Sequence, residues 1–306
     1  MPTALPRGLA LLTCIVLAAG CRSGPSGTVV YQSDFGLADG AVSAMKGVAQ
    51  GVDPSLALED LTHEIRPFDI WQGAYRLYQT APYWPEGTVF VSVVDPGVGT
   101  QRKSIVARSR AGHLFVTPDN GTLTLIDASV GIEAVRWIDE SQLRLPGSHT
   151  SHTFHGRDVH SYVGALLASG ELAFDDVGAA IDPGELVRLS YLEPRSEARD
   201  DGVWHIGIVP VLDPNFGNVW TDLPADPLEQ LDEGADILVR ITHEGRVYFE
   251  STLPYLSTFG KMPKGEPLAY RNSLGNLAFA LNQGSFAERF DIGSGTAWQV
   301  EVRLPR

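Results

Sequence analysis

Four short motifs place charged or polar side chains beside glycines, at points where predicted strands end. Glycine lets the backbone approach a ligand closely, and loops at strand ends often carry binding and catalytic residues. A single motif of this kind is usually an ordinary turn, so only their combination indicates a site. The motifs are Ser33-Asp34-Phe35-Gly36 with Asp39; Asp95-Pro96-Gly97-Val98-Gly99-Thr100 with Arg102; Thr153-Phe154-His155-Gly156-Arg157-Asp158; and Asp213-Pro214-Asn215-Phe216-Gly217-Asn218-Val219-Trp220.

Two further chemistries are suggested by these residue types. The glycine pair of the second motif could form a phosphate loop, but it lacks a third glycine and a following Lys-Ser/Thr pair, so nucleoside triphosphate binding is not expected. The histidines at positions 149, 152, 155 and 160 could converge on zinc, yet their spacing fits neither one helical face nor a standard zinc finger. Exposed loop histidines are the simpler interpretation, and no metal site is expected. His63, at a strand end, is expected to be a buried structural residue.

The elements that must position these motifs alternate between strand and helix in the first part of the chain. Residues 28–181 are therefore expected to form an α/β domain with a mainly parallel sheet, in which ligands bind at the carboxyl ends of the strands. Asp34 and Asp95 both follow such strands. β-branched runs predict strands at 28–33, 56–61, 88–94, 104–108 and 114–117, and helical spacing of apolar residues predicts helices at 42–52, 69–80 and 157–169.

Residues 203–306 have a different pattern, in which short predicted strands alternate with turn signals and helical periodicity nearly vanishes. This pattern predicts a separate all-β, barrel-like domain. Residues 182–202, rich in Pro, Glu, Arg and Asp, are expected to link the two domains. The predicted strands are 204–212, 235–242, 246–250, 268–271 and 298–304.

The composition is that of a folded, acidic protein. The chain of 306 residues is 43% hydrophobic and 20% charged, which is enough to bury a sizeable core, and its length suits two domains. Its formal net charge of −14 makes nucleic acids and anionic membrane surfaces poor partners. A cationic small molecule would instead be attracted.

The N-terminus has the features of a bacterial lipoprotein signal. An apolar run, residues 8–19, follows Arg7 and is too short for a stable transmembrane span. It ends in Leu17-Ala18-Ala19-Gly20-Cys21, which resembles a lipobox. We expect residues 1–20 to be removed as a signal peptide and Cys21 to carry diacylglycerol. An ordinary signal with a chance cysteine is the alternative.

Residues 21–27 would then be a tether between the lipid and the folded part. The protein is accordingly expected to be exported and anchored to a bacterial membrane by its lipid alone, either in the periplasm or in association with the outer membrane. Cys14 lies in the removed segment, so no thiol remains for a disulfide, a metal or a nucleophile.

Together and in this order, the motifs resemble the SAM hydroxide adenosyltransferase family, which is related to the fluorinase and chlorinase enzymes. The resemblance extends from Val29 to Val302. It implies a homotrimer whose active sites lie between the α/β domain of one subunit and the β-barrel domain of its neighbour. Also matching are Leu61-Thr62-His63-Glu64-Ile65, Pro85-Glu86-Gly87-Thr88, Pro118-Asp119-Asn120-Gly121 and Asn272-Ser273.

The reaction that the resemblance implies is hydrolysis of S-adenosylmethionine (SAM) to adenosine and methionine, by in-line attack of water or hydroxide on the 5′ carbon. SAM is the substrate, and no cofactor is implied. The sulfonium leaves as neutral methionine and needs no acid, but water must be positioned and relieved of a proton. Asp95, Arg102 and His155 match the Asp, Arg and His that the hydrolytic family uses for this purpose.

The resemblance also implies how the substrate is held. Asp34 corresponds to a carboxylate that accepts both ribose hydroxyls, Asp213 would receive the methionine ammonium, and Asn218 would face the adenine. Ser273 matches a carboxylate-binding serine, although the next residue, Leu274, replaces an arginine of the fluorinase. The remaining substrate-binding candidates come from the motifs and are Asp39, Phe154, Gly156 and Phe216.

Two alternatives remain open. A halogenase would use the same SAM chemistry, but Asp95 would place a carboxylate near the nucleophile and repel a halide. A lipid-anchored binding protein for adenosyl compounds would keep the pocket without turnover, and the intact Asp95, Arg102 and His155 argue against it.

Overall fold

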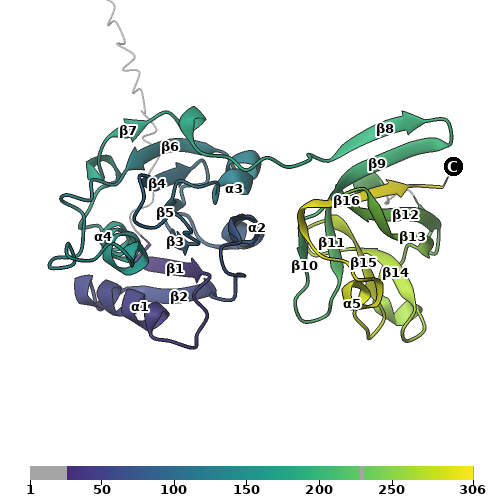
Figure 1. The fold of residues 1–306 in the computed structure, drawn as a ribbon, viewed down its shortest axis with the longest axis horizontal. Coiled ribbons are helices and arrows are strands. Elements are labelled where there is room, and N and C mark those ends of the chain that lie inside the picture. The colour runs from purple at the N-terminus through teal and green to yellow at the C-terminus, as the bar shows by residue number, and fades with distance from the viewer. Residues whose placement is uncertain (1–25, 228–230, 306) are drawn as a thin grey trace, which may run out of the picture.

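A seven-stranded mixed sheet organises the first part of the chain (Figure 1). The computed structural model describes residues 26–227 and 231–305. The strand order is β2-β1-β3-β5-β4-β6-β7. The strands are β1 (Thr28–Ser33), β2 (Ala57–Thr62), β3 (Val89–Val93), β4 (Ser104–Ser109), β5 (Leu114–Pro118), β6 (Ile132–Trp137) and β7 (Ala180–Ile181).

The sheet is less parallel than the sequence predicted. β1 pairs in parallel with β2 and β3, and β3 pairs in parallel with β5. β4 pairs antiparallel with both β5 and β6, and β6 pairs antiparallel with β7. Only Arg110–His113 separates β4 from β5, and a connection this short can join antiparallel neighbours but not parallel ones. The expectation of a mainly parallel sheet was therefore wrong for its second half.

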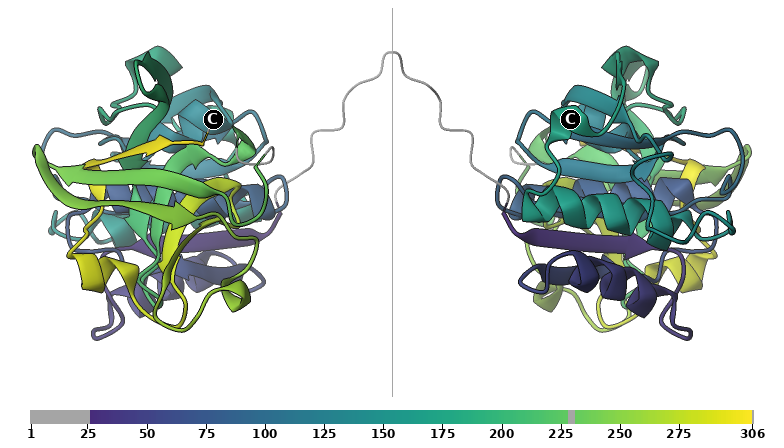
Figure 2. Two further views of the ribbon diagram at one scale, coloured as in Figure 1. Left: turned by 90° about the vertical axis from the view of Figure 1, so that its right-hand side faces the viewer. Right: turned by 90° about the vertical axis from the view of Figure 1, so that its left-hand side faces the viewer.

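Helices cover both faces of this sheet. α1 (Ala41–Val52) packs against α4 (Tyr162–Ser169) on one face, and α2 (Ile70–Thr80) packs against α3 (Thr124–Ser129) on the other; Figure 2 shows the first pair from outside. Burial on both faces explains why β3 is apolar at nearly every position. A π-helix, η2 (Gly156–Ser161), runs directly into α4. The short 3-10 helices here are η1 (Ala81–Tyr83), η3 (Phe174–Asp176) and η4 (Pro183–Glu185).

Two antiparallel sheets form the second part of the chain. Their strand orders are β10-β11-β15-β14 and β13-β12-β16-β9-β8. Among the described residues they pack against each other without closing into one barrel, so the barrel-like expectation holds only as an all-β, antiparallel domain. The elements are β8 (Arg195–Arg199), β9 (Gly202–Val209), β10 (Val211–Leu212), β11 (Val219–Pro224), β12 (Asp236–His243), β13 (Arg246–Pro254), η6 (Phe259–Lys261), β14 (Pro267–Arg271), β15 (Asn276–Leu281), α5 (Phe286–Phe290) and β16 (Gly295–Arg303).

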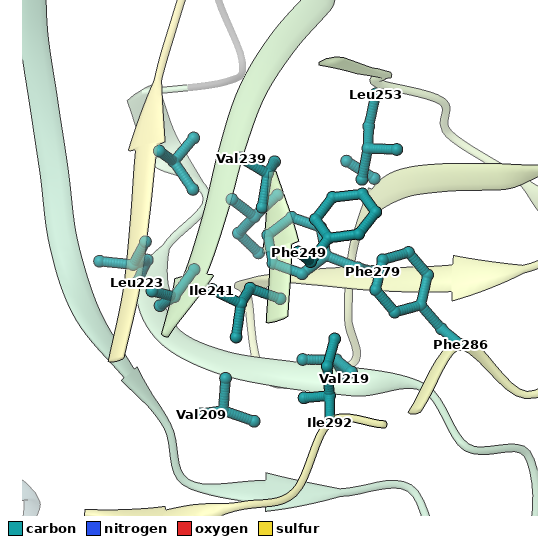
Figure 3. Packing of buried hydrophobic residues seen from close by; sticks show 14 of the residues in the cluster. Val209, Val219, Leu223, Val239, Ile241, Phe249, Leu253, Phe279, Phe286 and Ile292 are labelled. Atoms are coloured by element: carbon teal, nitrogen blue, oxygen red, sulfur yellow. The ribbon is translucent and has the colours of Figure 1, made fainter. Parts of the chain in front are cut away.

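The core between these two sheets is aliphatic and aromatic (Figure 3). Val239 and Ile241 alternate inward from β12, as period-two patterning requires. The Phe249 and Phe286 rings lie 5.0 Å apart and join β13 to α5. This core fixes the turns at one end of the sheets, where the fourth motif lies.

Direct contacts join the two parts. Trp71 of α2 donates through Nε1 to the carbonyl oxygen of Pro210 at 3.1 Å, and its ring lies 5.1 Å from that of Tyr191. The segment 182–202, expected as a linker, contains β8, which pairs with β9.

The predicted signal peptide, residues 1–20, and the lipidation candidate Cys21 lie outside the described residues. Among the residues that the structure describes, no helix is long and apolar enough to cross a membrane.

Candidate active site

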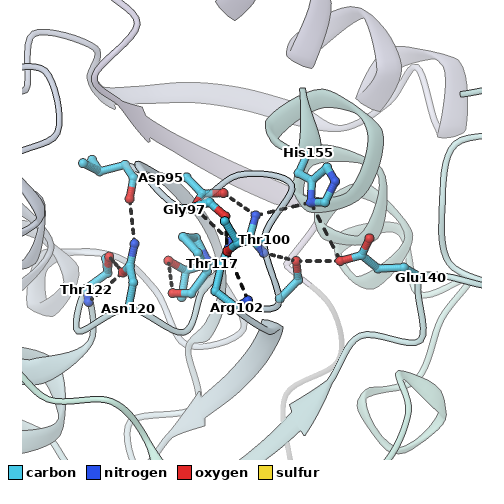
Figure 4. Close-up of polar contacts among 12 residues, drawn as sticks. Asp95, Gly97, Thr100, Arg102, Thr117, Asn120, Thr122, Glu140 and His155 are labelled. Atoms are coloured by element: carbon cyan, nitrogen blue, oxygen red, sulfur yellow. Dashed lines mark hydrogen bonds and ion pairs between the residues drawn. The ribbon is translucent and has the colours of Figure 1, made fainter. Parts of the chain in front are cut away.

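Asp95 and Arg102 form a nearly buried ion pair at the carboxyl end of β3. Arg102 Nε donates to Asp95 Oδ1 at 2.9 Å, and Nη2 donates to Oδ2 (Figure 4). The loop between them is closed by Thr100, whose hydroxyl donates to the Gly97 carbonyl at 2.6 Å. A Cβ on Gly97 would make a tight contact, 3.2 Å from the Arg102 side chain, so glycine leaves room for the arginine here. The second motif therefore folds back so that its arginine meets its own aspartate.

His155 lies on the other side of the same guanidinium. Arg102 Nη2 is 3.3 Å from His155 Nδ1. A guanidinium can only donate, so Nδ1 accepts and the neutral ring carries its proton on Nε2. Burial lowers the pKa of His155 below its usual value, Glu140 opposes this shift, and Arg102 adds to it. The imidazole is therefore neutral at pH 7.

Sequence reasoning missed two members of this network, Ser104 and Glu140. Arg102 Nη1 donates to Ser104 Oγ at 2.7 Å, and Ser104 Oγ donates to Glu140 Oε1 at 3.0 Å. The same Glu140 oxygen lies 3.9 Å from His155 Nδ1 (Figure 4). Glu140 follows β6 in a segment with no glycine motif, and no local signal could have identified it. Glu140 thus joins its own segment to those of Ser104 and His155, which are distant in the sequence.

His160 lies behind His155 on the π-helix η2. Its side chain is fully buried, and neither ring nitrogen has a hydrogen-bond partner among the described residues. Burial lowers the pKa of His160 well below its usual value, and the nearby Arg102 acts in the same direction. Inserted π-turns are frequent at functional sites, and this one follows directly after His155.

In the described part of the chain, the histidines at positions 149, 152, 155 and 160 are not arranged as a zinc site. No group of three or more His, Cys, Asp or Glu side chains there is arranged to hold a metal ion. The ring centroids of His152 and His155 are 6.4 Å apart. His160 is buried rather than exposed, contrary to the loop-histidine interpretation for that residue.

The Asp34 turn is held in place by His63. His63 Nδ1 is 2.7 Å from Ser33 Oγ, its Nε2 is 2.9 Å from Asp60 Oδ1, and its carbonyl accepts from the Gly36 amide at 2.8 Å. His63 is 3% exposed, which agrees with the structural role expected for it. Asp34 Oδ2 accepts from the Phe68 amide at 2.8 Å. Among the described residues no protein group donates to the other carboxylate oxygen of Asp34, which can face a ligand.

Asp39 lies just before α1. Its Oδ1 accepts from the Ala41 amide at 2.8 Å, and the residue is exposed.

Phe154 and Gly156 connect the first and third motifs. The rings of Phe154 and Phe35 meet edge to face, with centroids 5.7 Å apart. A Cβ on Gly156 would lie 3.2 Å from Val93 and 3.3 Å from both rings. Because residue 156 is glycine, the chain that enters η2 can lie against Val93 at the end of β3, two residues before Asp95.

The fourth motif lines a cavity of about 910 Å³ in the second part of the chain. Asn218 Nδ2 donates to Asp213 Oδ2 at 3.2 Å, and the Asp213 amide donates back to the Asn218 carbonyl at 2.9 Å. Phe216 is 66% exposed at the mouth, and Ser273 lines the same cavity.

The site residues thus fall into two groups. Asp34, Asp95, Arg102, Phe154, His155 and Gly156 belong to the α/β part, and Asp213, Phe216, Asn218 and Ser273 gather in the all-β part. The cavity of the second group contains no residue of the first.

Comparisons with known proteins match both parts. Residues 29–178 match the SAM hydroxide adenosyltransferase N-terminal domain, and residues 207–299 match the C-terminal domain of that name. The chain is 36% identical to the (R)-S-adenosyl-L-methionine hydrolase of Salinispora tropica, over 90% of this chain and 98% of the relative. It is 31% identical to the fluorinase of Nocardia brasiliensis, over 90% of this chain and 96% of the relative. The crystal structure of an uncharacterized conserved protein from Thermotoga maritima superposes with a TM-score of 0.79 at 32% identity, covering 90% of this chain and 99% of that one.

Proposed function

The chain belongs to the SAM hydroxide adenosyltransferase family, and from that premise we propose that it hydrolyses SAM to adenosine and methionine. The observation that carries the proposal is the buried contact of Asp95 with Arg102 and of Arg102 with His155. Because several relatives are named as hydrolases of the (R) epimer of SAM, we further propose that epimer as the substrate.

The reaction needs a proton acceptor more than an acid. Water attacks the 5′ carbon as the bond from that carbon to sulfur breaks, and the bonding electrons stay on sulfur and neutralise the sulfonium. One proton must leave the attacking water. Asp95 is the acceptor because each carboxylate oxygen keeps a lone pair beyond its bond to Arg102. The neutral His155 presents Nε2–H and instead holds Arg102 in place.

Arg102 supplies the positive charge that this reaction needs. Its charge stabilises the hydroxide character that develops on the nucleophile, and its ion pair keeps the Asp95 carboxylate oriented. Ser104 and Glu140 fix the remaining side of the guanidinium.

The test is direct. Protein lacking residues 1–21 is incubated separately with (R)-SAM and (S)-SAM, and products are separated by chromatography. Adenosine and methionine should appear in equal amounts, from (R)-SAM much faster than from (S)-SAM. Absence of both products would overturn the proposal, and equal rates would overturn its stereochemical part.

A halogenase is the second candidate because fluorinases are among the relatives. A halide site must desolvate an anion, and a carboxylate close by in a poorly solvated pocket makes this strongly unfavourable. Asp95, which is 5% exposed, is such a carboxylate. Added chloride or fluoride should therefore give no 5′-halo-adenosine in the same chromatograms.

We propose that the working assembly is a homotrimer that binds SAM between subunits. The separation of the two groups of site residues supports this, as do the large exposed apolar side chains of Leu37 and Phe68, next to the Asp34 turn. Light scattering should give three times the chain mass, and a fully active monomer would contradict it.

We also propose that the protein is exported and lipid-anchored through Cys21 to a bacterial membrane, with no other membrane contact. The support is the sequence from Leu17 to Cys21. In detergent phase separation the wild type should enter the detergent phase and Cys21→Ser the aqueous phase. A wild type found wholly in the aqueous phase with its first twenty residues intact would rule out the anchor.

A further inference from the structure

A cation of the α/β part reaches the turn that carries Ser273. Arg76, on α2, lines a cavity of about 410 Å³ together with Thr62, Gln79, Ser273 and Leu274. Ser273 lines this cavity and also the larger one that contains Asp213. Ser273 is therefore shared by the cavity that Arg76 lines and the cavity that Asp213 lines.

The partners of Arg76 are neutral. Its Nη1 donates to Gln79 Oε1 at 2.7 Å, and its Nη2 donates to the Leu212 carbonyl, next to Asp213, at 3.3 Å. No ion pair within 4.0 Å includes Arg76 among the residues that the structure describes. Burial lowers the pKa of Arg76 from its ordinary value, and Asp213 opposes the shift. The remaining N–H donors of Arg76 make no hydrogen bond among the described residues and can face a ligand in the cavity.

The turn lies beside another cation, Arg271, which already has a carboxylate partner. Leu274 is apolar, and the nearest arginine along the chain, Arg271, lies 3.4 Å from Asp226 in an ion pair. A serine hydroxyl beside a guanidinium is a fitting pair for a carboxylate, because arginine can donate two parallel hydrogen bonds to its two oxygens.

We propose that Arg76, with Ser273, binds the α-carboxylate of the methionine part of SAM and makes the enzyme selective for substrates that carry this group. The inference rests on the proposed function. With Asp213 taking the ammonium, the amino-acid end of the substrate would meet one negative and one positive side chain near Ser273.

The experiment compares SAM with decarboxylated SAM, which keeps the sulfonium and the reacting 5′ carbon but lacks the carboxylate. The wild type should prefer SAM by about 10- to 100-fold in kcat/KM, the range expected for losing a charge-assisted pair. In Arg76→Gln this preference should fall to near one, and Arg76→Lys should lie between because it keeps the charge without the planar fork. Inhibition by adenosine, which has no carboxylate, should change less than about twofold.

Arg246→Gln is the matched control. Arg246 is exposed on the β12–β13 hairpin, so this variant removes one positive charge away from the cavity and should keep the wild-type preference. If Arg76→Gln instead lowers kcat/KM equally for both substrates, Arg76 only docks α2 onto Leu212, and the proposal is wrong. If that variant does not fold, Ser273→Ala on the exposed turn should reduce the same preference, and an unchanged preference there would overturn the proposal.

Failure of the proposed function can be recognised separately. A wild type that binds SAM without hydrolysing it would overturn the hydrolase assignment, and calorimetric affinities for SAM and decarboxylated SAM in the wild type and Arg76→Gln would then decide the role of Arg76. A wild type that binds neither compound would overturn both.

Discussion

The guanidinium of Arg102 makes two hydrogen bonds to the carboxylate of Asp95, with Nε donating to Oδ1 at 2.9 Å and Nη2 donating to Oδ2. The Asp95 side chain is 5% exposed and that of Arg102 is 11% exposed, so water competes little for either. The carboxylate is therefore fixed in direction. A proton acceptor at a substitution centre needs this positioning.

Replacing Asp95 should mainly affect turnover. Asp95→Asn keeps the shape but removes the charge, and kcat should fall by about 10² to 10⁴-fold while KM for SAM changes little. His155→Ala should lower kcat in the same range, because Arg102 loses its third support. Steady-state kinetics would measure both. Asp175→Asn, at a 74% exposed carboxylate paired with Arg136, is the control and should match the wild type.

Asp95→Asn should also have a smaller free energy of unfolding than the wild type. Without Asp95, the buried Arg102 charge keeps only Ser104 and His155 as neutral partners, and losing one member of a buried pair commonly costs about 3 to 5 kcal/mol. Chemical denaturation would measure the loss. Wild-type turnover in Asp95→Asn would show that another group accepts the proton.

The acid limb of the pH–rate profile should reflect protonation of His155. Protonation of Nδ1 would abolish its bond from Arg102, so activity requires the neutral ring. Burial lowers the pKa of His155, so activity should persist below pH 6.5 and fall only at more acidic pH. Glu140 raises that pKa, and Glu140→Gln should therefore move the limb further toward acid. A limb in Glu140→Gln that moved toward higher pH, or stayed in place, would contradict this coupling.

Asp34→Ala should weaken the binding of SAM and of adenosine to the same extent, because both ligands carry the ribose. Loss of a buried acceptor for a hydroxyl pair costs about 1 to 3 kcal/mol, which corresponds to roughly 5- to 150-fold in affinity. Calorimetry with adenosine would measure it. Asp175→Asn, at an exposed carboxylate paired with Arg136, is the control and should bind adenosine normally. Unchanged affinity in Asp34→Ala would make Asp34 a turn residue bound to Phe68.

The local signals in the sequence predicted the early elements well. The β-branched run at 28–33 is β1, and the helix predicted over 69–80 begins after Asp69, whose side chain accepts from the Gln72 amide. Strand β3 lies within its predicted range as well. In these segments periodicity and capping both act over a few residues, so the sequence alone is sufficient.

Elements and contacts that depend on distant residues were not predictable in this way. β11 and β15 pair with each other across more than fifty residues, and neither was among the predicted strands. Glu140 and Arg76 reach their sites only through tertiary packing. The π-turn at η2 likewise cannot be distinguished from α-helix by apolar spacing.

The last prediction concerns His160 and the stability of the fold at low pH. In the folded chain burial holds the pKa of His160 well below 6.5, whereas in the unfolded chain the imidazole titrates near 6.5. As the pH falls below 6.5 the unfolded state takes up a proton that the folded state does not, so the free energy of unfolding should fall by up to about 1.4 kcal/mol per pH unit from this residue. His160→Leu removes this term and leaves no unpartnered ring nitrogen, so its free energy of unfolding should depend less steeply on pH between 6.5 and 4.5. Urea denaturation across this range would measure the slopes, with His149→Gln, at an exposed loop position, as a control that keeps the wild-type slope. Equal slopes for the wild type and His160→Leu would mean that His160 gains its proton in the folded protein as readily as in the unfolded chain, and the packing around η2 would then have to admit a charge.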